Sequence, residues 1–119
     1  MREILFRGKC NETCKYNGQW IEGFYGEDDG KPIIVRSTGP GFGYFCEPDS
    51  IGQYTGLTDK DDRKIFENGY MIIDNKTYKV IFDNVEYILT NIFNCDIITL
   101  KNNSIKGVFV DEIWSDKKI

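Results

Sequence analysis

The segment "YKVIFDNVEYIL" at residues 78–89 constrains the fold more than any other part of this sequence. Its apolar residues alternate from Tyr78 to Phe82 and alternate again from Val85 to Leu89. Side chains two residues apart share one face of a β-strand, so the pattern predicts two paired strands. Asp83 and Asn84 supply the two-residue loop between them, because both residue types tolerate positive φ.

The same period of two recurs along the chain, and no window of about eleven residues has the apolar spacing of a helix. The pattern predicts short strands at residues 2–7, 18–25, 32–36, 52–58, 63–67, 70–73, 77–82, 85–91, 96–101 and 105–110. We therefore expect a mostly β fold, with a small SH3-like barrel in the C-terminal half and additional N-terminal strands. The alternative is an α+β fold with one or two short helices, one of them at Pro48 in "CEPDSIGQ".

A chain of 119 residues is expected to form one domain. Residues that break strands cluster in "STGPGFG" at 37–43, which is the best candidate for a flexible loop or for a seam between two halves. The single domain would then have an N-terminal part at 1–47 and a C-terminal barrel part at 48–119.

The charged run "IGQYTGLTDKDDRKIFENG" reads as a hairpin and not as a site. Asp59 is suited to the first position of a type I turn, because its carboxylate accepts a bond from the N–H two residues on. The loop from Asp59 to Arg63 then needs a residue with positive φ, and Asp62 occupies that position.

Composition argues against several partners. Fifteen basic and nineteen acidic residues give a net charge of −4, which makes broad nucleic-acid binding unlikely. No apolar run approaches the roughly 20 residues that span a bilayer, so we expect no membrane partner. The N-terminal "MREILFRGK" has no apolar core of a signal peptide, which favours a cytoplasmic protein.

No residue is predicted to be catalytic, and no metal or cofactor is expected. The chain has no histidine, which excludes Ser–His and Cys–His nucleophilic pairs. The acidic clusters lie in predicted turns, and "GPGFG" lacks the lysine of a phosphate-binding loop. In a cytoplasm the four cysteines should be thiols, with Cys46 and Cys95 in the core and Cys10 and Cys14 lining a loop.

Aromatic residues offer the candidate interaction surface, which comprises Trp20, Tyr25, Tyr44 and Trp114. Such side chains could stack on the bases of a single strand. Their ordinary role is packing within and between strands, and few Lys or Arg residues lie beside them in the sequence.

Three blocks resemble the YopX family of phage and prophage proteins. They are "MREILFRGK" with "NGQWIEG", then "PDSIGQYTGLTDKDDRKIFENG", and more weakly "VFVDEIWSD". The chain departs from the family at Asp61-Asp62, where Asn-Gly is common, and at Glu67-Asn68-Gly69, where Glu-Gly-Asp is common. The loop with Cys10 and Cys14 looks like a local insertion. The resemblance implies a phage-encoded protein in a bacterial host, with no established activity to carry over.

These observations together predict a phage or prophage accessory protein that is not an enzyme and that binds or assembles with a protein partner. A homo-oligomer is expected, because many short strands leave edges that need cover. The alternative is single-stranded nucleic-acid binding through a face of the barrel.

Overall fold

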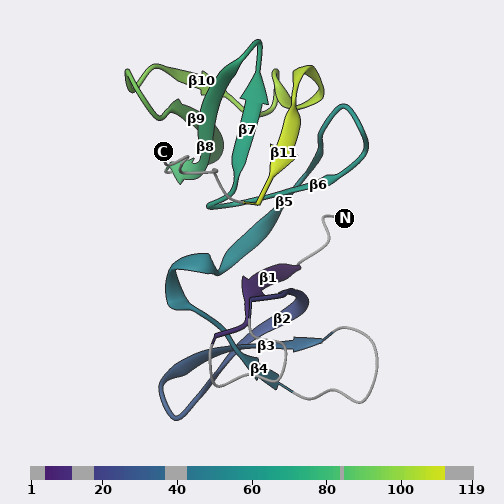
Figure 1. Cartoon of the computed structure of the whole chain (residues 1–119), viewed down its shortest axis with the longest axis vertical. Helices are drawn as coiled ribbons and strands as arrows, with labels where there is room; N and C mark the ends of the chain where they lie inside the picture. The colour runs from purple at the N-terminus through teal and green to yellow at the C-terminus, as the bar shows by residue number, and fades with distance from the viewer. Residues whose placement is uncertain (1–4, 12–17, 37–42, 84, 112–119) are drawn as a thin grey trace. The chain divides into compact units, whose positions relative to one another are not determined.

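The computed structural model describes residues 5–11, 18–36, 43–83 and 85–111, and it is mostly β (Figure 1). Its strands are β1 (Phe6–Lys9), β2 (Trp20–Asp28), β3 (Lys31–Arg36), β4 (Gly43–Phe45), β5 (Gly52–Thr58), β6 (Lys64–Phe66), β7 (Tyr70–Ile73), β8 (Lys76–Asp83), β9 (Glu86–Asn91), β10 (Ile97–Thr99) and β11 (Val108–Val110). Two 3-10 turns, η1 (Pro48–Ser50) and η2 (Ser104–Lys106), are the helical elements of the described residues. The expected mostly β class is confirmed. The alternative, an α+β fold, is not, and the segment at Pro48 forms a 3-10 turn of three residues.

The chain divides into two compact units, an N-terminal unit at Met1–Tyr54 and a C-terminal unit at Thr55–Ile119. The boundary falls inside β5, because Gly52 and Gln53 pair with β1 whereas the hydroxyl of Thr55 donates to the carbonyl of Ile65 in β6. Most of the seam expected at residues 37–43 lies outside the described residues, and Gly43 begins β4.

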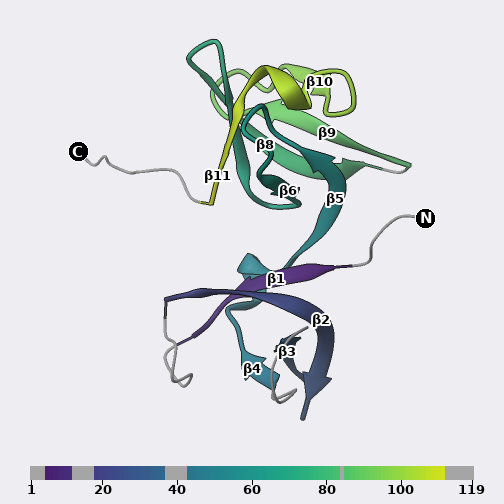
Figure 2. The same ribbon diagram turned by 90° about the vertical axis from the view of Figure 1, so that its right-hand side faces the viewer.

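The N-terminal unit is an antiparallel sheet in the order β4-β3-β2-β1-β5. Strand β2 pairs with β1 through Trp20–Gly23 and with β3 through Gly23–Asp28, so it exchanges partners at Gly23. A Cβ atom at Gly23 would collide with the carbonyl of Val35, and only glycine allows this approach of the two strands. Figure 2 shows the bend that β2 makes along its length.

The core of the N-terminal unit contains two cysteines. Cys10, Ile21, Ile34 and Cys46 are fully buried there, and Phe6, Tyr44 and Ile51 pack against them. The expected core position of Cys46 is confirmed, whereas the expected loop position of Cys10 is wrong. Cys10 continues β1 by one residue and forms a β-bridge to Cys46, which brings it inside.

The main sheet of the C-terminal unit has the order β10-β9-β8-β7-β11 and is antiparallel throughout. The buried apolar residues of the C-terminal unit are Ile65, Phe66, Met71, Ile73, Tyr78, Val80, Leu89, Leu100 and Phe109. The described strands do not close into a barrel, because β10 and β11 stand at opposite edges of this sheet. The SH3-like barrel expected in this half is therefore not confirmed.

The hairpin of β8 and β9 forms as the alternation predicts, with Val80 opposite Leu89. Asp83 pairs with Glu86 and belongs to the strand, so its predicted place in the loop is wrong. Asn84 lies outside the described residues. Val85 is 88% exposed and contributes nothing to the core, because it lies in the turn between β8 and β9.

The turn after β9 places a polar residue inside and a cysteine outside. Asn91 is buried, and its Oδ1 accepts the N–H groups of Phe93 at 2.8 Å and Asn94 at 3.2 Å. Cys95 follows with a φ of 64° and is exposed, so its predicted core position is wrong. The cause is the turn, in which the buried side chain of Asn91 accepts two backbone N–H groups and Cys95 is left at the surface.

The hairpin of β5 and β6 has the turn chemistry expected from its sequence. Asp62 has a φ of 64°, as predicted for the bulge position. The Oδ1 atom of Asp59 accepts the N–H of Asp61 at 2.8 Å and the N–H of Arg63 at 2.9 Å. This carboxylate therefore organises the whole turn from its first position.

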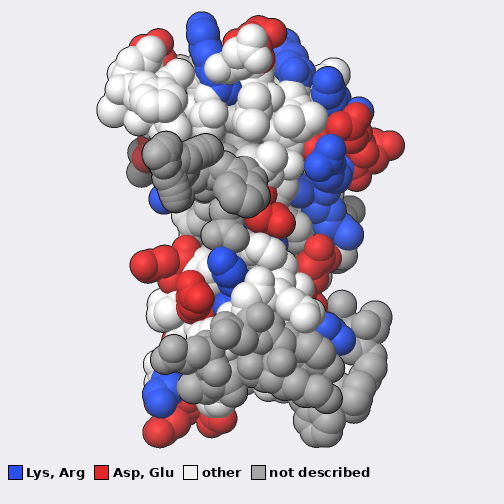
Figure 3. Space-filling view, viewed as in Figure 1, with Lys and Arg blue, Asp and Glu red and all other residues white. Residues whose placement is uncertain are grey.

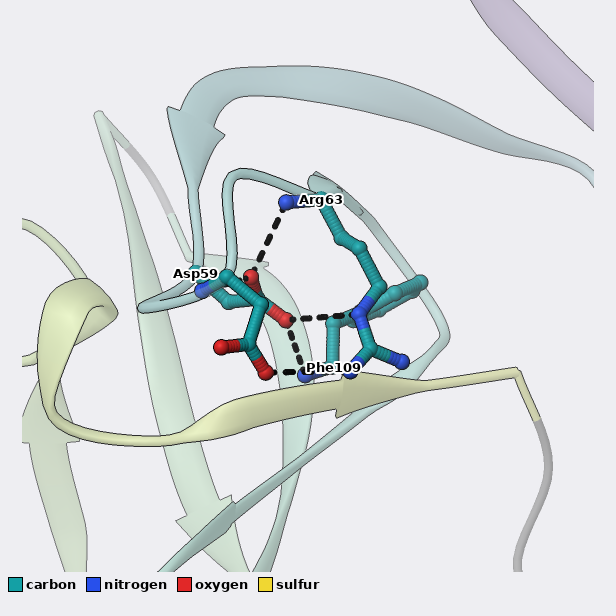
Figure 4. A network of polar contacts seen from close by, with 4 residues as sticks. Asp59, Arg63 and Phe109 are labelled. Carbon is teal, nitrogen blue, oxygen red and sulfur yellow. Dashed lines mark hydrogen bonds and ion pairs between the residues drawn. The ribbon is translucent and has the colours of Figure 1, made fainter.

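Asp59 also reaches a strand that is remote in sequence. Its Oδ2 accepts the N–H of Phe109 on β11 at 2.8 Å, and the N–H of Lys60 donates to the carbonyl of Gly107 at 3.1 Å. Figure 4 shows this carboxylate with Arg63 and Phe109. Burial of the Asp59 carboxyl raises its pKa, but the bonds from Phe109, Arg63 and Asp61 and the charge of Arg63 outweigh burial and hold the pKa below 3.8.

We expect Asp59→Asn to lower the free energy of unfolding by about 2–4 kcal/mol, measured by urea denaturation. Asparagine has one acceptor oxygen and one NH2 group, so a buried N–H donor would face another donor. Asp61→Asn is the matched control. The Asp61 side chain is 49% exposed, and loss of its charge should cost no more than about 0.5 kcal/mol. Equal costs for the two variants would contradict the structural role of Asp59.

The stability difference between the wild type and Asp59→Asn should depend on pH. Because the folded pKa of Asp59 lies below the unfolded value, its stabilisation is complete above the unfolded value and is lost as the pH falls through the folded one. The gap in unfolding free energy between the wild type and Asp59→Asn should hold from about pH 7 to 5 and shrink below about pH 4. A gap that stays constant to the lowest pH at which the wild type folds would refute this.

Candidate interaction surface

Three residues of the N-terminal sheet form one row across β2, β3 and β4. Tyr25 lies opposite Ile34, and Ile34 lies opposite Tyr44. Residues directly opposite each other point to the same face, so the two tyrosines flank a buried isoleucine. Tyr44 packs against the core, whereas Tyr25 is 43% exposed. The row thus runs from a core ring to a surface ring.

A second row lies beside the first and contains no side chain at its centre. Phe6 lies opposite Gly23, and Gly23 lies opposite Arg36. The rings of Phe6 and Tyr25 are 5.6 Å apart between centroids, and the guanidinium of Arg36 lies 5.6 Å from the centroid of Tyr44. We call Phe6, Tyr25, Arg36 and Tyr44 the tyrosine face. It combines exposed aromatic area with one cation.

The hydroxyl of Tyr25 has a defined partner. It donates to Oε2 of Glu27, two residues further along β2, at 3.2 Å. Loss of hydration, followed by this bond and the negative charge of Glu27, raises the pKa of Tyr25 above 10.0. The tyrosine is therefore a neutral phenol at neutral pH, able to donate and accept hydrogen bonds at its edge.

Trp20 lies on the other face of β2, because it is an odd number of positions from Tyr25. The guanidinium of the buried Arg7 lies 3.9 Å from the centroid of the Trp20 ring. Phe24 shares this face and is 56% exposed. The structure describes three of the four aromatic residues singled out from the sequence, and these three do not share one face. Tyr25 and Tyr44 lie together, Trp20 is opposite, and Trp114 lies outside the described residues.

Sequence reasoning missed the two arginines. Arg7 is thirteen positions before Trp20, and Arg36 is eight before Tyr44, so neither is beside its ring in the sequence. Strand pairing brings each arginine against its ring. Alternation alone could have placed Phe6 on one face of a strand. It could not have predicted the contact of Phe6 with Tyr25, because that contact depends on the register of β1 against β2.

Comparison with protein-family models finds none that matches this chain, and comparison with curated proteins finds no significant relative. Membership of the YopX family therefore stays a prediction that rests on the sequence blocks quoted above.

The described residues show neither a membrane-spanning helix nor a cluster of metal ligands. No helix there is long and apolar enough to cross a membrane. No group of three or more Cys, Asp or Glu residues in that part of the chain is arranged to hold a metal ion.

We expect the two tyrosines to differ in their effect on stability. Tyr44→Ala removes a ring that packs on the core and should cost about 2–3 kcal/mol of unfolding free energy. Tyr25→Ala removes an exposed ring and should cost about 1 kcal/mol or less. Urea denaturation followed by circular dichroism measures both values. If Tyr25→Ala proved as costly as Tyr44→Ala, Tyr25 would be a core residue and unsuited to binding.

Proposed function

We propose that this chain is a phage- or prophage-encoded accessory protein that binds a protein partner and catalyses no reaction. The tyrosine face supports the binding role. Tyrosine and arginine supply much of the binding energy at protein interfaces, and Tyr25 presents its ring while packed on Phe6. The proposed origin, in a bacterial cytoplasm, rests on the YopX-like blocks, above all "PDSIGQYTGLTDKDDRKIFENG".

Charge supports a protein partner over a nucleic acid. The chain carries a net charge of −4. In the face of the molecule shown in Figure 3, the described Lys and Arg side chains lie among Asp and Glu side chains. A nucleic-acid surface would need a continuous basic field to neutralise phosphates. A surface of mixed charge fits a protein interface better.

Affinity capture from bacteria that carry the phage, with matched variants of this chain as bait, tests the proposal. We expect a partner that the wild type retains and that Tyr25→Ala binds at least tenfold more weakly, which is about 1.4 kcal/mol. Phe93→Ala is the control, because Phe93 is 85% exposed and belongs to the C-terminal unit. If Tyr25→Ala retained every captured partner, the tyrosine face would not be the binding site.

Single-stranded nucleic-acid binding through a sheet face is the second candidate. The contact of Arg36 with Tyr44 favours it, since stacking and phosphate neutralisation together bind single strands. The anisotropy of a labelled oligonucleotide decides between the two. We expect no saturable binding at physiological salt. If the oligonucleotide bound saturably and Arg36→Ala abolished that binding, the partner would be a single-stranded nucleic acid and not a protein.

We also propose that the protein self-associates, because edge strands such as β10 and β4 present backbone N–H and C=O groups with which a second chain can pair. Light scattering should give a mass above 13.8 kDa. A closed symmetric assembly keeps that mass constant over a range of concentration. A monomer mass at every concentration would rule out the oligomer, and it would leave binding of a different protein in place.

A further inference from the structure

Cys10 and Cys46 lie directly opposite each other in an antiparallel β-bridge. The bonds around the bridge define the kind of pair. The N–H of Asn11 donates to the carbonyl of Phe45 at 3.1 Å, and the N–H of Glu47 donates to the carbonyl of Lys9 at 2.9 Å. The cysteine N–H groups donate elsewhere, to Gln19 and Pro32, so the cysteines form a non-hydrogen-bonded pair.

This type of pair brings two side chains as close as an antiparallel sheet allows. Its Cα atoms are typically about 4.5 Å apart, and its Cβ atoms are closer than in the alternate pair. A disulfide requires Cα atoms about 4.4–6.8 Å apart and Cβ vectors that do not diverge. The backbone of β1 and of the residue after β4 therefore already meets the spacing that a disulfide needs.

The two side chains also share one environment. Both are buried in the core cluster of the N-terminal unit, and both are thiols in the structure. The S–H of Cys46 donates to the carbonyl of Tyr44 at 3.4 Å, and its sulfur lies beside Gly8, where a Cβ atom would be 2.9 Å away. A change of side-chain rotamer can turn this sulfur from Gly8 towards Cys10 without moving the backbone.

We propose that Cys10 and Cys46 are a redox modification site, at which an oxidised low-molecular-weight disulfide such as oxidised glutathione produces a disulfide between β1 and β4. This inference stands independently of the proposed function, because it needs no partner. It also gives these two residues a shared role that their separation in the sequence conceals.

The chemistry proceeds by two exchanges. The thiolate of one cysteine attacks oxidised glutathione, forms a mixed disulfide and releases one glutathione thiolate. The thiolate of the second cysteine attacks the protein sulfur of that mixed disulfide and releases the other. The protons of the two protein thiols end on the two glutathione thiols. The pair loses two electrons, and oxidised glutathione gains them.

Burial sets the order of events. Cys95 is exposed and should form a mixed disulfide first, whereas the first exchange at the buried pair needs a local opening of the bridge. Once that exchange has occurred, the second is intramolecular and fast, because the attacking sulfur is already opposite.

Peptide mapping of the full chain tests the proposal. The native protein is incubated with oxidised glutathione, quenched in acid with N-ethylmaleimide, and cleaved after glutamate. The cysteines then lie on four separate peptides, residues 4–12, 13–22, 28–47 and 87–112. We expect a covalent link between peptides 4–12 and 28–47. A link that joins Cys14 to either cysteine, or two unlinked thiols after Cys95 has reacted completely, would overturn the proposal.

A variant with only the proposed pair sharpens the result. Cys14→Ser combined with Cys95→Ser should still lose two thiols on oxidation, and its melting temperature should rise by about 5 °C or more. Adding Cys46→Ser should remove both effects. An unchanged melting temperature in the linked protein would show that the disulfide does not clamp the sheet. If the doubly substituted chain did not fold, the map of the wild type would decide alone.

Discussion

The carboxylate of Asp59 is the interaction on which the C-terminal unit depends most. Removing a charged group from water is costly, and three backbone N–H donors compensate that cost here. Two of them lie in the turn, and the third belongs to Phe109, fifty residues away. The N–H of Phe109 points away from β7 and would otherwise be an open donor on an edge strand. The same group that shapes a local turn therefore caps a sheet edge.

The N-terminal unit is built on small residues. Gly8 leaves space for the sulfur of Cys46, and Gly23 lets β3 approach β2 closely. With two cysteines and two isoleucines at its centre, this core has little room for large rings. Phe6 and Tyr44 therefore pack at its margin, and Tyr25 extends beyond it. The exposed aromatic area of the tyrosine face is thus a consequence of how small the core is.

Local chemistry was readable from the sequence, and long-range pairing was not. The positive φ of Asp62 and the turn at Asp59 depend on neighbours within four positions, so residue type alone predicted them. Alternation likewise predicted most strands. The bridge of Cys10 to Cys46 and the bond of Asp59 to Phe109 depend on register between remote segments, which one sequence does not encode visibly. The predicted core position of Cys95 was wrong because it rested on the apolar character of cysteine, whereas the turn organised by Asn91 leaves Cys95 exposed.

Tyr44 connects the two properties proposed for the N-terminal unit. Its carbonyl accepts the S–H of Cys46, and its ring lies near the guanidinium of Arg36. A cysteine in a disulfide has no S–H to donate, so oxidation would take this donor away from the Tyr44 carbonyl. Strand β4 has only three residues, and the carbonyl that loses its donor belongs to the same residue as the ring. A partner that binds the tyrosine face more tightly in one redox state would stabilise that state by the difference between its two binding free energies.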